Sequence, residues 1–408
     1  MELSVSQQVF AWGFGMAAVM GAVVNRTNFC TMGAVSDWVN MNDTGRFRSW
    51  VFAMAVAIVG VLLLQATGRV AVDLAVNGNE AFPPYRTPMF AWPRYVLGGL
   101  LFGIGMTLGS GCGNKTLIRI GGGNLKSLLV LATMAVGAYL MMYTNFMGTL
   151  FLPWMKPLFI DLSAHGIDSQ GLGQLLASLS GGDLAMVRYV VGGLVALGLL
   201  VWAFRSPDFR GRADLVLGGG VVGLAVVGAW DVTAGPLGQS WLEEAEFMDQ
   251  PPLHVAAQSY TFVSPTGDLL NWLHSGLAGH LISFGMVAAA GVIVGSFLYA
   301  LLSRSFRIEW FASFGDFLRH LAGGFLMGIG GVLGMGCTIG QGVTGVSTLA
   351  LGSFLTFASI ALGAALTMKV ELYRLVYEGE AGFLSALVTG MADLHLLPSG
   401  MRRFDPVS

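Results

Sequence analysis

Long apolar stretches separated by short polar loops dominate the chain. A helix needs about 20 predominantly apolar residues to cross the hydrocarbon core of a bilayer. Seven stretches approach that length, at about 10–31, 49–68, 125–145, 186–204, 212–232, 278–302 and 350–370. Two more, 94–111 and 319–336, are apolar but shorter and interrupted by glycine. The pattern predicts about nine transmembrane helices, and it leaves open whether the weaker stretch 381–397 crosses or lies at the interface.

The composition excludes most other classes of protein. Lys, Arg, Asp and Glu together make up 11% of the 408 residues, whereas a soluble globular protein carries about 25%. Hydrophobic residues reach 54%. So few charges cannot cover a surface that faces water, which excludes a soluble enzyme, a disordered chain and a nucleic-acid binder. The fold class expected is an all-α polytopic membrane protein, and the first apolar stretch is expected to remain as a span rather than a cleaved signal.

Lysine and arginine are distributed unevenly between alternate loops, and that bias sets orientation. Twelve lie in 34–48, 204–214, 303–319 and the C-terminal part, and five lie in the opposite loops. The richer loops are expected on the cytoplasmic side, which places the N-terminus in the periplasm. Four basic residues beside the glycine-rich breaks or inside a span belong to neither group: Arg26, Lys115, Arg119 and Lys126.

The two glycine-rich stretches are copies of each other. RYVLGGLLFGIGMTLGSGCG at 94–113 and RHLAGGFLMGIGGVLGMGCT at 319–338 are identical at 11 of 20 positions. The distribution of loop charges predicts that the two copies enter the membrane from opposite faces, as in the inverted-topology repeats of secondary transporters. We therefore expect one integral membrane domain built from two inverted repeats, 1–208 and 209–408, with short broken or re-entrant helices. Close helix packing alone explains glycines, but not a cysteine at the same place in both copies.

All three cysteines lie at a break or at the end of a span. Cys112 and Cys337 are expected to face each other, and Cys30 to lie at the inner end of the first span. Glycine-rich turns and helix starts near 115 and 341 offer backbone N–H groups to an anion, and thiols suit a soft, sulfur-containing one. The candidate substrate-binding residues are Asn25, Arg26, Cys30, Gly111, Cys112, Gly113, Asn114, Lys115, Thr116, Gly336, Cys337, Thr338 and Gln341.

Several kinds of chemistry have no signal here. Three cysteines without a CxxC pair and six scattered histidines predict neither a zinc site nor a disulfide scaffold, so no metal or cofactor is expected. No GxxxxGK[ST] motif is present, so uptake is expected to be passive or ion-coupled rather than driven by ATP.

These motifs resemble the YeeE/YedE family of bacterial inner-membrane proteins. The resemblance runs from about 10 to 370 and rests on five motifs: NRTNFCTMGA (25–34), GIGxxLGxGC in both halves, GQG (340–342), VSPTGDLLNWL (263–273) and GSFLYALLSRSFR (295–307). It implies an inverted-repeat helical fold in which Cys30, Cys112 and Cys337 pass thiosulfate along by S–H contacts. It also implies a cytoplasmic TusA/SirA-like sulfur carrier as a partner, besides the anion and the lipid bilayer.

The hypothesis is therefore a sulfur-anion importer, most simply for thiosulfate, and not an enzyme. Two alternatives remain open. A membrane sulfurtransferase or thiol redox enzyme would attack sulfur covalently and would need an accessible thiolate. A transporter of a selenium compound would use the same scaffold with another substrate.

Overall fold

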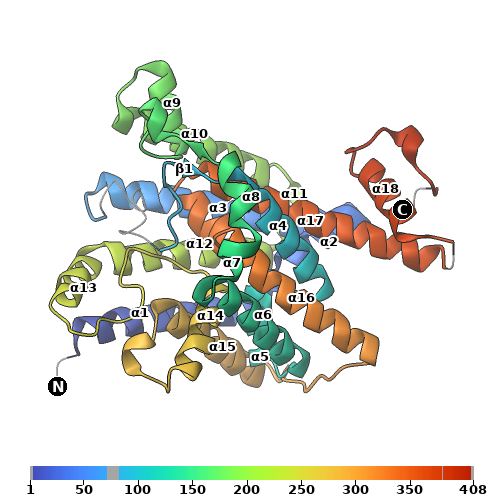
Figure 1. Ribbon diagram of the computed structural model, residues 1–408, viewed down its shortest axis with the longest axis horizontal. Helices are drawn as coiled ribbons and strands as arrows, with labels where there is room; N and C mark the ends of the chain where they lie inside the picture. The colour runs from blue at the N-terminus through green and yellow to red at the C-terminus, as the bar shows by residue number, and fades with distance from the viewer. Residues whose placement is uncertain (1–2, 71–81, 379, 406–408) are drawn as a thin grey trace.

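The computed structural model describes residues 3–70, 82–378 and 380–405, and these are mostly helical (Figure 1). The α-helices are α1 (Val5–Thr27), α2 (Thr31–Met41), α3 (Gly45–Ala66), α4 (Trp92–Leu108), α5 (Gly113–Gly121), α6 (Leu125–Tyr143), α7 (Phe146–Leu150), α8 (Leu152–Met155), α9 (Leu172–Ser180), α10 (Leu184–Phe204), α11 (Pro207–Gly211), α12 (Ala213–Ala234), α13 (Pro236–Glu246), α14 (Ser264–His274), α15 (Phe284–Leu302), α16 (Phe314–Leu333), α17 (Leu351–Val376) and α18 (Phe383–Asp393). The shorter elements are the 3-10 helices η1 (Lys156–Leu158), η2 (Ser163–His165), η3 (Gly279–Leu281) and η5 (Ser399–Met401), the π-helix η4 (Gly340–Gly345), and the strands β1 (Met89–Phe90) and β2 (Ile160–Asp161).

Eight helical segments of the described residues are long and apolar enough to cross a membrane. They are Val5–Met41, Gly45–Ala66, Trp92–Gly121, Leu125–Tyr143, Leu184–Phe204, Ala213–Ala234, Phe284–Leu302 and Leu351–Val376. All eight coincide with stretches expected from the hydropathy pattern. The chain is thus a multi-pass membrane protein.

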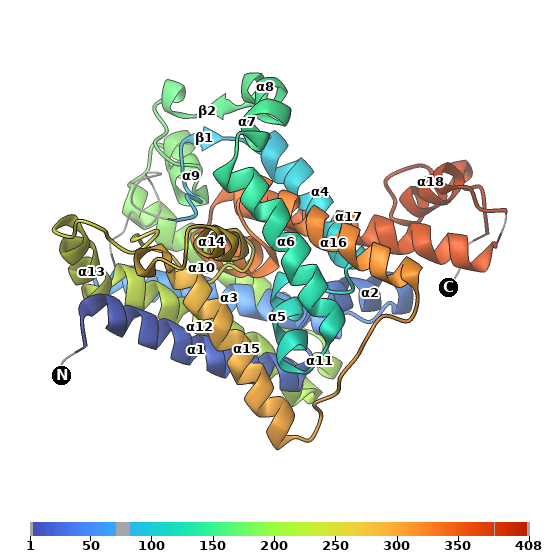
Figure 2. The same ribbon diagram turned by 60° about the horizontal axis from the view of Figure 1, so that its bottom comes forward.

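Two expected stretches fall outside these eight. The stretch 319–336 lies mainly on α16, a helix of 20 residues whose first two turns carry Asp316, Arg319 and His320 and are therefore less apolar. The weak stretch 381–397 contains only α18, whose 11 residues extend about 16 Å, half the thickness of the hydrocarbon core. α18 is too short to cross and lies beside the end of α17, away from the bundle, in both views (Figures 1 and 2).

Five of the long helices begin where a side chain accepts from the first free N–H groups. Ser4 accepts a hydrogen bond from Gln7 at the start of α1 and completes a capping box with the Gln7 side chain. α6, α10, α15 and α16 begin in the same way, each with a polar side chain that accepts from the first turn. These caps belong to Asn124, Asp183, Ser283 and Ser313.

The two glycine-rich helices, α4 and α16, cross at the centre of the molecule (Figure 2). A Cβ atom on Gly98 would lie 2.3 Å from Gly334 N, and one on Gly323 would lie 2.4 Å from Gly109 N. Since the start of each helix meets the end of the other, the two run antiparallel. The contacts are reciprocal, because each pair maps onto the other at the repeat offset.

The flanking helices show the same reciprocity. α4 packs against α17, where a Cβ atom on Gly103 would lie 2.2 Å from Ile360 O. α16 packs against α6, where a Cβ atom on Gly328 would lie 2.3 Å from Met134 O. Backbone therefore touches backbone on both sides of the α4–α16 pair, and only glycine allows this approach.

Both glycine-rich helices also end in the same turn. Ser110 after α4 and Met335 after α16 adopt left-handed φ angles of 58° and 59°. Gly111 N–H donates to Met106 O at 2.8 Å, and Gly336 N–H donates to Gly331 O at 2.7 Å. This Schellman-type ending satisfies the last carbonyl groups and turns the chain sharply at each break.

The structure contains a small two-stranded sheet, which the all-α expectation did not include. β1 pairs antiparallel with β2, with Met89 opposite Asp161 and Phe90 opposite Ile160. The pairing fastens the long loop after α6 to the segment that enters α4. Two residues per strand give no periodic signal, so the sequence pattern could not indicate it.

Replacing Gly328 by Ala will destabilise the protein, because the new methyl group meets the Met134 carbonyl of a packed helix that cannot shift cheaply. We expect a loss of about 1–3 kcal/mol, typical of overpacking. Gly198 on α10 is the matched control, since nothing lies within 4 Å of its Cβ position. Gly198→Ala should be neutral or stabilising. The apparent melting temperature in detergent measures both, and equal values would contradict the packing argument.

Candidate functional site

Each cysteine immediately precedes a short helix. Cys30 precedes α2, Cys112 precedes α5, and Cys337 precedes a helical turn over 338–347 whose centre is the π-helix η4. The helices thus start at Gly113 and Thr338, a few residues before the expected 115 and 341. All three thiols are free and buried. The cysteines therefore occupy the helix ends where N–H groups lack intrahelical partners.

The contacts of the three cysteines place them in a row. The Cys112 side chain interacts with Cys30 on one side and with Thr338 on the other. The Cys337 Sγ atom accepts from Gly340 N–H at 3.4 Å and lies 4.0 Å from the Thr261 hydroxyl. Cys112 thus meets the second half through Thr338, the neighbour of Cys337. The resulting order is Cys337 and Thr338, then Cys112, then Cys30.

Buried polar atoms without partners accompany this row. Thr31, Asn114, Thr338 and Gln341 are each at most 2% exposed. One oxygen of three of them, Thr31 Oγ1, Asn114 Oδ1 and Gln341 Oε1, has no hydrogen-bond partner among the described residues, and Thr338 Oγ1 has only the contact with the Cys112 thiol. Buried polar groups are almost always paired. Three unpaired oxygens and one paired only with a thiol, all within four residues of a cysteine, indicate a place where a polar solute binds.

Cys30 opens into a cavity of about 550 Å³ at the end of the bundle where α1 ends and α2 and α3 begin. Its basic lining residues are Arg46, Lys115, Arg119 and Arg307, and its acidic ones are Asp37 and Glu309. Both acids are engaged, since Asp37 forms an ion pair with Arg46 and Glu309 accepts from Asn124. Lys115 Nζ donates to Asn28 Oδ1 at 3.2 Å. We call this the basic cavity, because Lys115 and Arg119 have no ion-pair partner among the described residues.

The remaining candidates lie around the same row, with one exception. Asn25 lines the basic cavity and donates to Ser296, and the Thr116 hydroxyl donates to Cys112 O at 3.1 Å. Gly111 lies against the stem of Lys115, Gly113 lies against Phe262 O, and Gly336 lies against Gln341. Arg26 is exposed on α1 and is absent from the described lining of the basic cavity.

The structure adds residues that the sequence did not indicate. The Tyr85 hydroxyl is buried, interacts electrostatically with Cys337, and has no hydrogen-bond partner among the described residues. Thr261, beside the Cys337 sulfur, is the second addition. Both lie in irregular segments outside the two glycine-rich copies, so neither periodicity nor internal similarity could have pointed to them. Neither is among the described residues that line the basic cavity.

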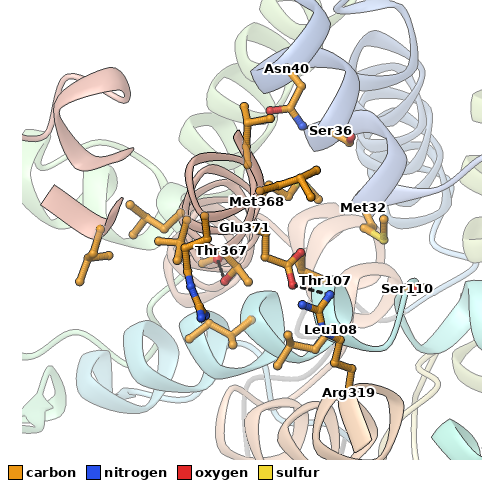
Figure 3. A pocket seen from close by; sticks show the side chains of 18 of the residues that line it. Met32, Ser36, Asn40, Thr107, Leu108, Ser110, Arg319, Thr367, Met368 and Glu371 are labelled. Carbon is orange, nitrogen blue, oxygen red and sulfur yellow. Dashed lines mark hydrogen bonds and ion pairs between the residues drawn. The ribbon is translucent and has the colours of Figure 1, made fainter. Parts of the chain in front are cut away.

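A second, larger cavity of about 1090 Å³ lies between α2, α4, α16, α17 and α18 (Figure 3). Arg319 and Glu371 meet inside it at 3.4 Å. It shares Met32, Ser36 and Ser110 with the basic cavity, so α2 separates the two. No cysteine is among its described lining residues, and among described residues no cluster of His, Cys, Asp or Glu could hold a metal ion.

Comparison with known proteins identifies relatives over most of the chain. The thiosulfate transporter TsuA of Escherichia coli (strain K12) is 26% identical over 335 residues, 81% of this chain and 86% of that protein. The thiosulfate transporter TsuA of Spirochaeta thermophila is 24% identical over 364 residues, 86% of this chain and 96% of that protein.

The family comparison covers both glycine-rich breaks and all three cysteines. The model of the Sulphur transport family matches residues 26–366. That range contains every candidate residue except Asn25, and it confirms the resemblance carried by the repeated glycine–cysteine motifs. This multi-pass membrane protein therefore belongs to the Sulphur transport family, also called the YeeE/YedE family.

Proposed function

We propose that the protein imports thiosulfate along a path lined by Cys337, Cys112 and Cys30. One observation carries the proposal: each cysteine lies at the start of a short helix, Cys112 contacts both Cys30 and Thr338, the neighbour of Cys337, and Cys30 lines the basic cavity. The named substrate of both relatives supports the choice of anion. The protein is accordingly a transporter and not an enzyme.

The row has the chemistry that such an anion needs. Helix N-termini carry partial positive charge and offer N–H donors to an oxyanion. The Cys30 and Cys112 thiols make only weak contacts with the Gly33 and Lys115 N–H groups of their own helices, so an anion can compete for those donors. A thiol donates weakly, and its polarisable sulfur suits the sulfur end of thiosulfate. Weak contacts at successive positions let an ion move on rather than stay bound.

Residues 1–208 and 209–408 form two inverted repeats in this proposal. The reciprocal glycine contacts of α4 and α16 and their identical helix endings support it. An antiparallel crossing of equivalent helices is what a two-fold axis in the membrane plane produces. The row of cysteines lies at that crossing, where transporters with this plan bind their substrates.

The basic cavity faces the cytoplasm in this proposal, and the N-terminus lies in the periplasm of a bacterial inner membrane. The excess of lysine and arginine in the loops around the cavity supports that orientation. α1 begins at one end of the molecule and α18 lies at the other (Figures 1 and 2), which suits termini on opposite sides. A TusA/SirA-like sulfur carrier would then meet the imported thiosulfate at the mouth of the basic cavity.

Uptake of labelled thiosulfate into proteoliposomes that contain this protein alone tests the proposal. We expect Cys112→Ala and Cys337→Ala to lower uptake about ten- to a hundredfold, the effect of losing a hydrogen bond to a charged group. Thr133→Val is a control on α6, because the Thr133 hydroxyl bonds only within its own helix. It should leave uptake unchanged.

The Cys112→Ser variant distinguishes a loss of transport from a loss of folding. A serine before a helix caps it and stabilises it by about 0.5–2 kcal/mol relative to alanine. Cys112→Ser should therefore keep the melting temperature or raise it, and still transport poorly, because the hard hydroxyl engages the free N–H groups. Full uptake by Cys112→Ser and Cys337→Ser would contradict the proposed path. A persulfide trapped on one cysteine during turnover would instead favour the covalent sulfurtransferase alternative.

The positive charge of the basic cavity should strengthen the binding of thiosulfate from that side of the membrane. Lys115→Gln and Arg119→Gln should weaken the apparent affinity for thiosulfate measured from the cavity side, and high salt should reduce the difference from wild type. Arg210→Gln changes an exposed arginine of a different loop and serves as the control. Equal affinities for all four proteins would show that the cavity does not handle the anion.

A further inference from the structure

A buried carboxylate lies apart from the cysteines, on α14. Asp268 is 1% exposed. Its carboxylate accepts from the Tyr143 hydroxyl of α6 at 2.7 Å and from the Ser283 hydroxyl at 3.0 Å, and His254 Nε2 lies 3.3 Å from Oδ1. The sequence around Asp268 suggests that it caps the start of a helix. The structure shows otherwise, because Asp268 lies inside α14, and the residue before α14 makes no side-chain capping hydrogen bond.

His254 connects this carboxylate to solvent. Its side chain is 21% exposed, against 1% for that of Asp268. The imidazole ring stacks on Phe82 with centroids 3.9 Å apart and planes 5° apart. A proton from solvent can therefore reach the imidazole and be shared with the buried carboxylate.

Few other titratable groups face the pair. Tyr143 of α6 is the one in direct contact; the Tyr139 ring lies 5.5 Å from that of Tyr143, and the His274 ring lies a further 6.3 Å from that of Tyr139. Among the described residues, no lysine, arginine or glutamate forms an ion pair with His254 or Asp268. The pair therefore has a net charge of −1 when the imidazole is neutral and zero when it holds a proton.

The segment between the two residues forms one wall of the proposed path. Thr261 lies beside the Cys337 sulfur, and Tyr260 O accepts from the Thr344 hydroxyl at 2.8 Å. Phe82, which stacks on His254, donates its N–H to Ala257 O at 3.1 Å, and Tyr85 follows three residues later. The pair is thus connected to the groups around Cys337 through one continuous segment of chain and through Phe82.

We propose that the His254–Asp268 pair binds a proton together with the anion, so that uptake is coupled to protons. This rests on the proposed function. A negative charge on the pair repels an anion near Cys337, and a proton removes that charge. Protonation and anion binding must then favour each other equally, by linkage. A proton that travels with the anion also offsets the opposing effect of an inside-negative membrane potential.

The experiment uses proteoliposomes with a trapped pH dye and the membrane potential clamped at zero. On adding thiosulfate outside, wild type should take it up and acidify the interior. An inward proton gradient should raise the steady-state ratio of inside to outside thiosulfate. The expected increase is about tenfold per pH unit for each coupled proton, because one pH unit is a tenfold ratio of proton concentration.

Asp268→Asn is the diagnostic variant, because the asparagine oxygen can still accept from the Tyr143 hydroxyl and its NH2 group can donate to the Ser283 hydroxyl, but the amide binds no proton. It should move thiosulfate only down its gradient, with no acidification and no response to pH. His254→Gln should behave in the same way and covers the case in which Asp268→Asn does not fold. His274→Gln, an exposed histidine at the end of the same helix, should match wild type.

The possible failures are distinguishable. Thiosulfate uptake without acidification and without a response to the gradient in wild type overturns proton coupling and leaves the proposed transport intact. Acidification that persists in both Asp268→Asn and His254→Gln overturns the assignment to this pair. No thiosulfate uptake by folded wild type under any gradient overturns the proposed function and this inference with it.

Discussion

Backbone contact between α4 and α16 is the constraint on which the centre of the molecule depends. Each helix presents glycines to the other, so their main chains meet without intervening side chains. A bilayer core contains no water to satisfy free N–H and C=O groups, so helices can stop inside it only where protein covers the ends. The close crossing supplies that cover, and both helices can end in a tight turn beside it.

Those endings decide where the polar chemistry lies. After each turn the chain starts a new short helix, and the residue before that start is a cysteine. Serine, threonine, aspartate or asparagine would cap such a helix strongly, whereas a thiol does so weakly. Cysteine therefore holds the first N–H groups of these helices only weakly, and buried oxygens such as Asn114 Oδ1 and Gln341 Oε1 lie unpaired close by. The site is polar because its helix ends are incompletely satisfied.

The surroundings of Cys30 and of Cys337, at the two ends of the cysteine row, differ in character. On one side Lys115 and Arg119 give the basic cavity an excess of positive charge. Near Cys337, Tyr85 and Thr261 supply neutral groups from irregular segments, and the His254–Asp268 pair supplies an acidic group from a loop and from α14. If the two halves are inverted repeats, as proposed, such differences are what would give the path a direction.

The sequence by itself determined the class of protein, most of its spans and the importance of the two breaks. Hydropathy is a local property of the chain, and a helix that crosses the bilayer must be apolar over about 20 residues. Eight spans could therefore be placed without any information about tertiary contacts. The repeat also pointed to Cys112 and Cys337, because internal similarity shows which positions recur. Tertiary structure alone decided the row itself: that Cys112 adjoins Cys30 and Thr338, that Arg26 lies on the outside, and that Tyr85 and Asp268 reach the interior. Those placements depend on contacts between segments far apart in the chain, and neither periodicity nor composition records which distant segments will meet.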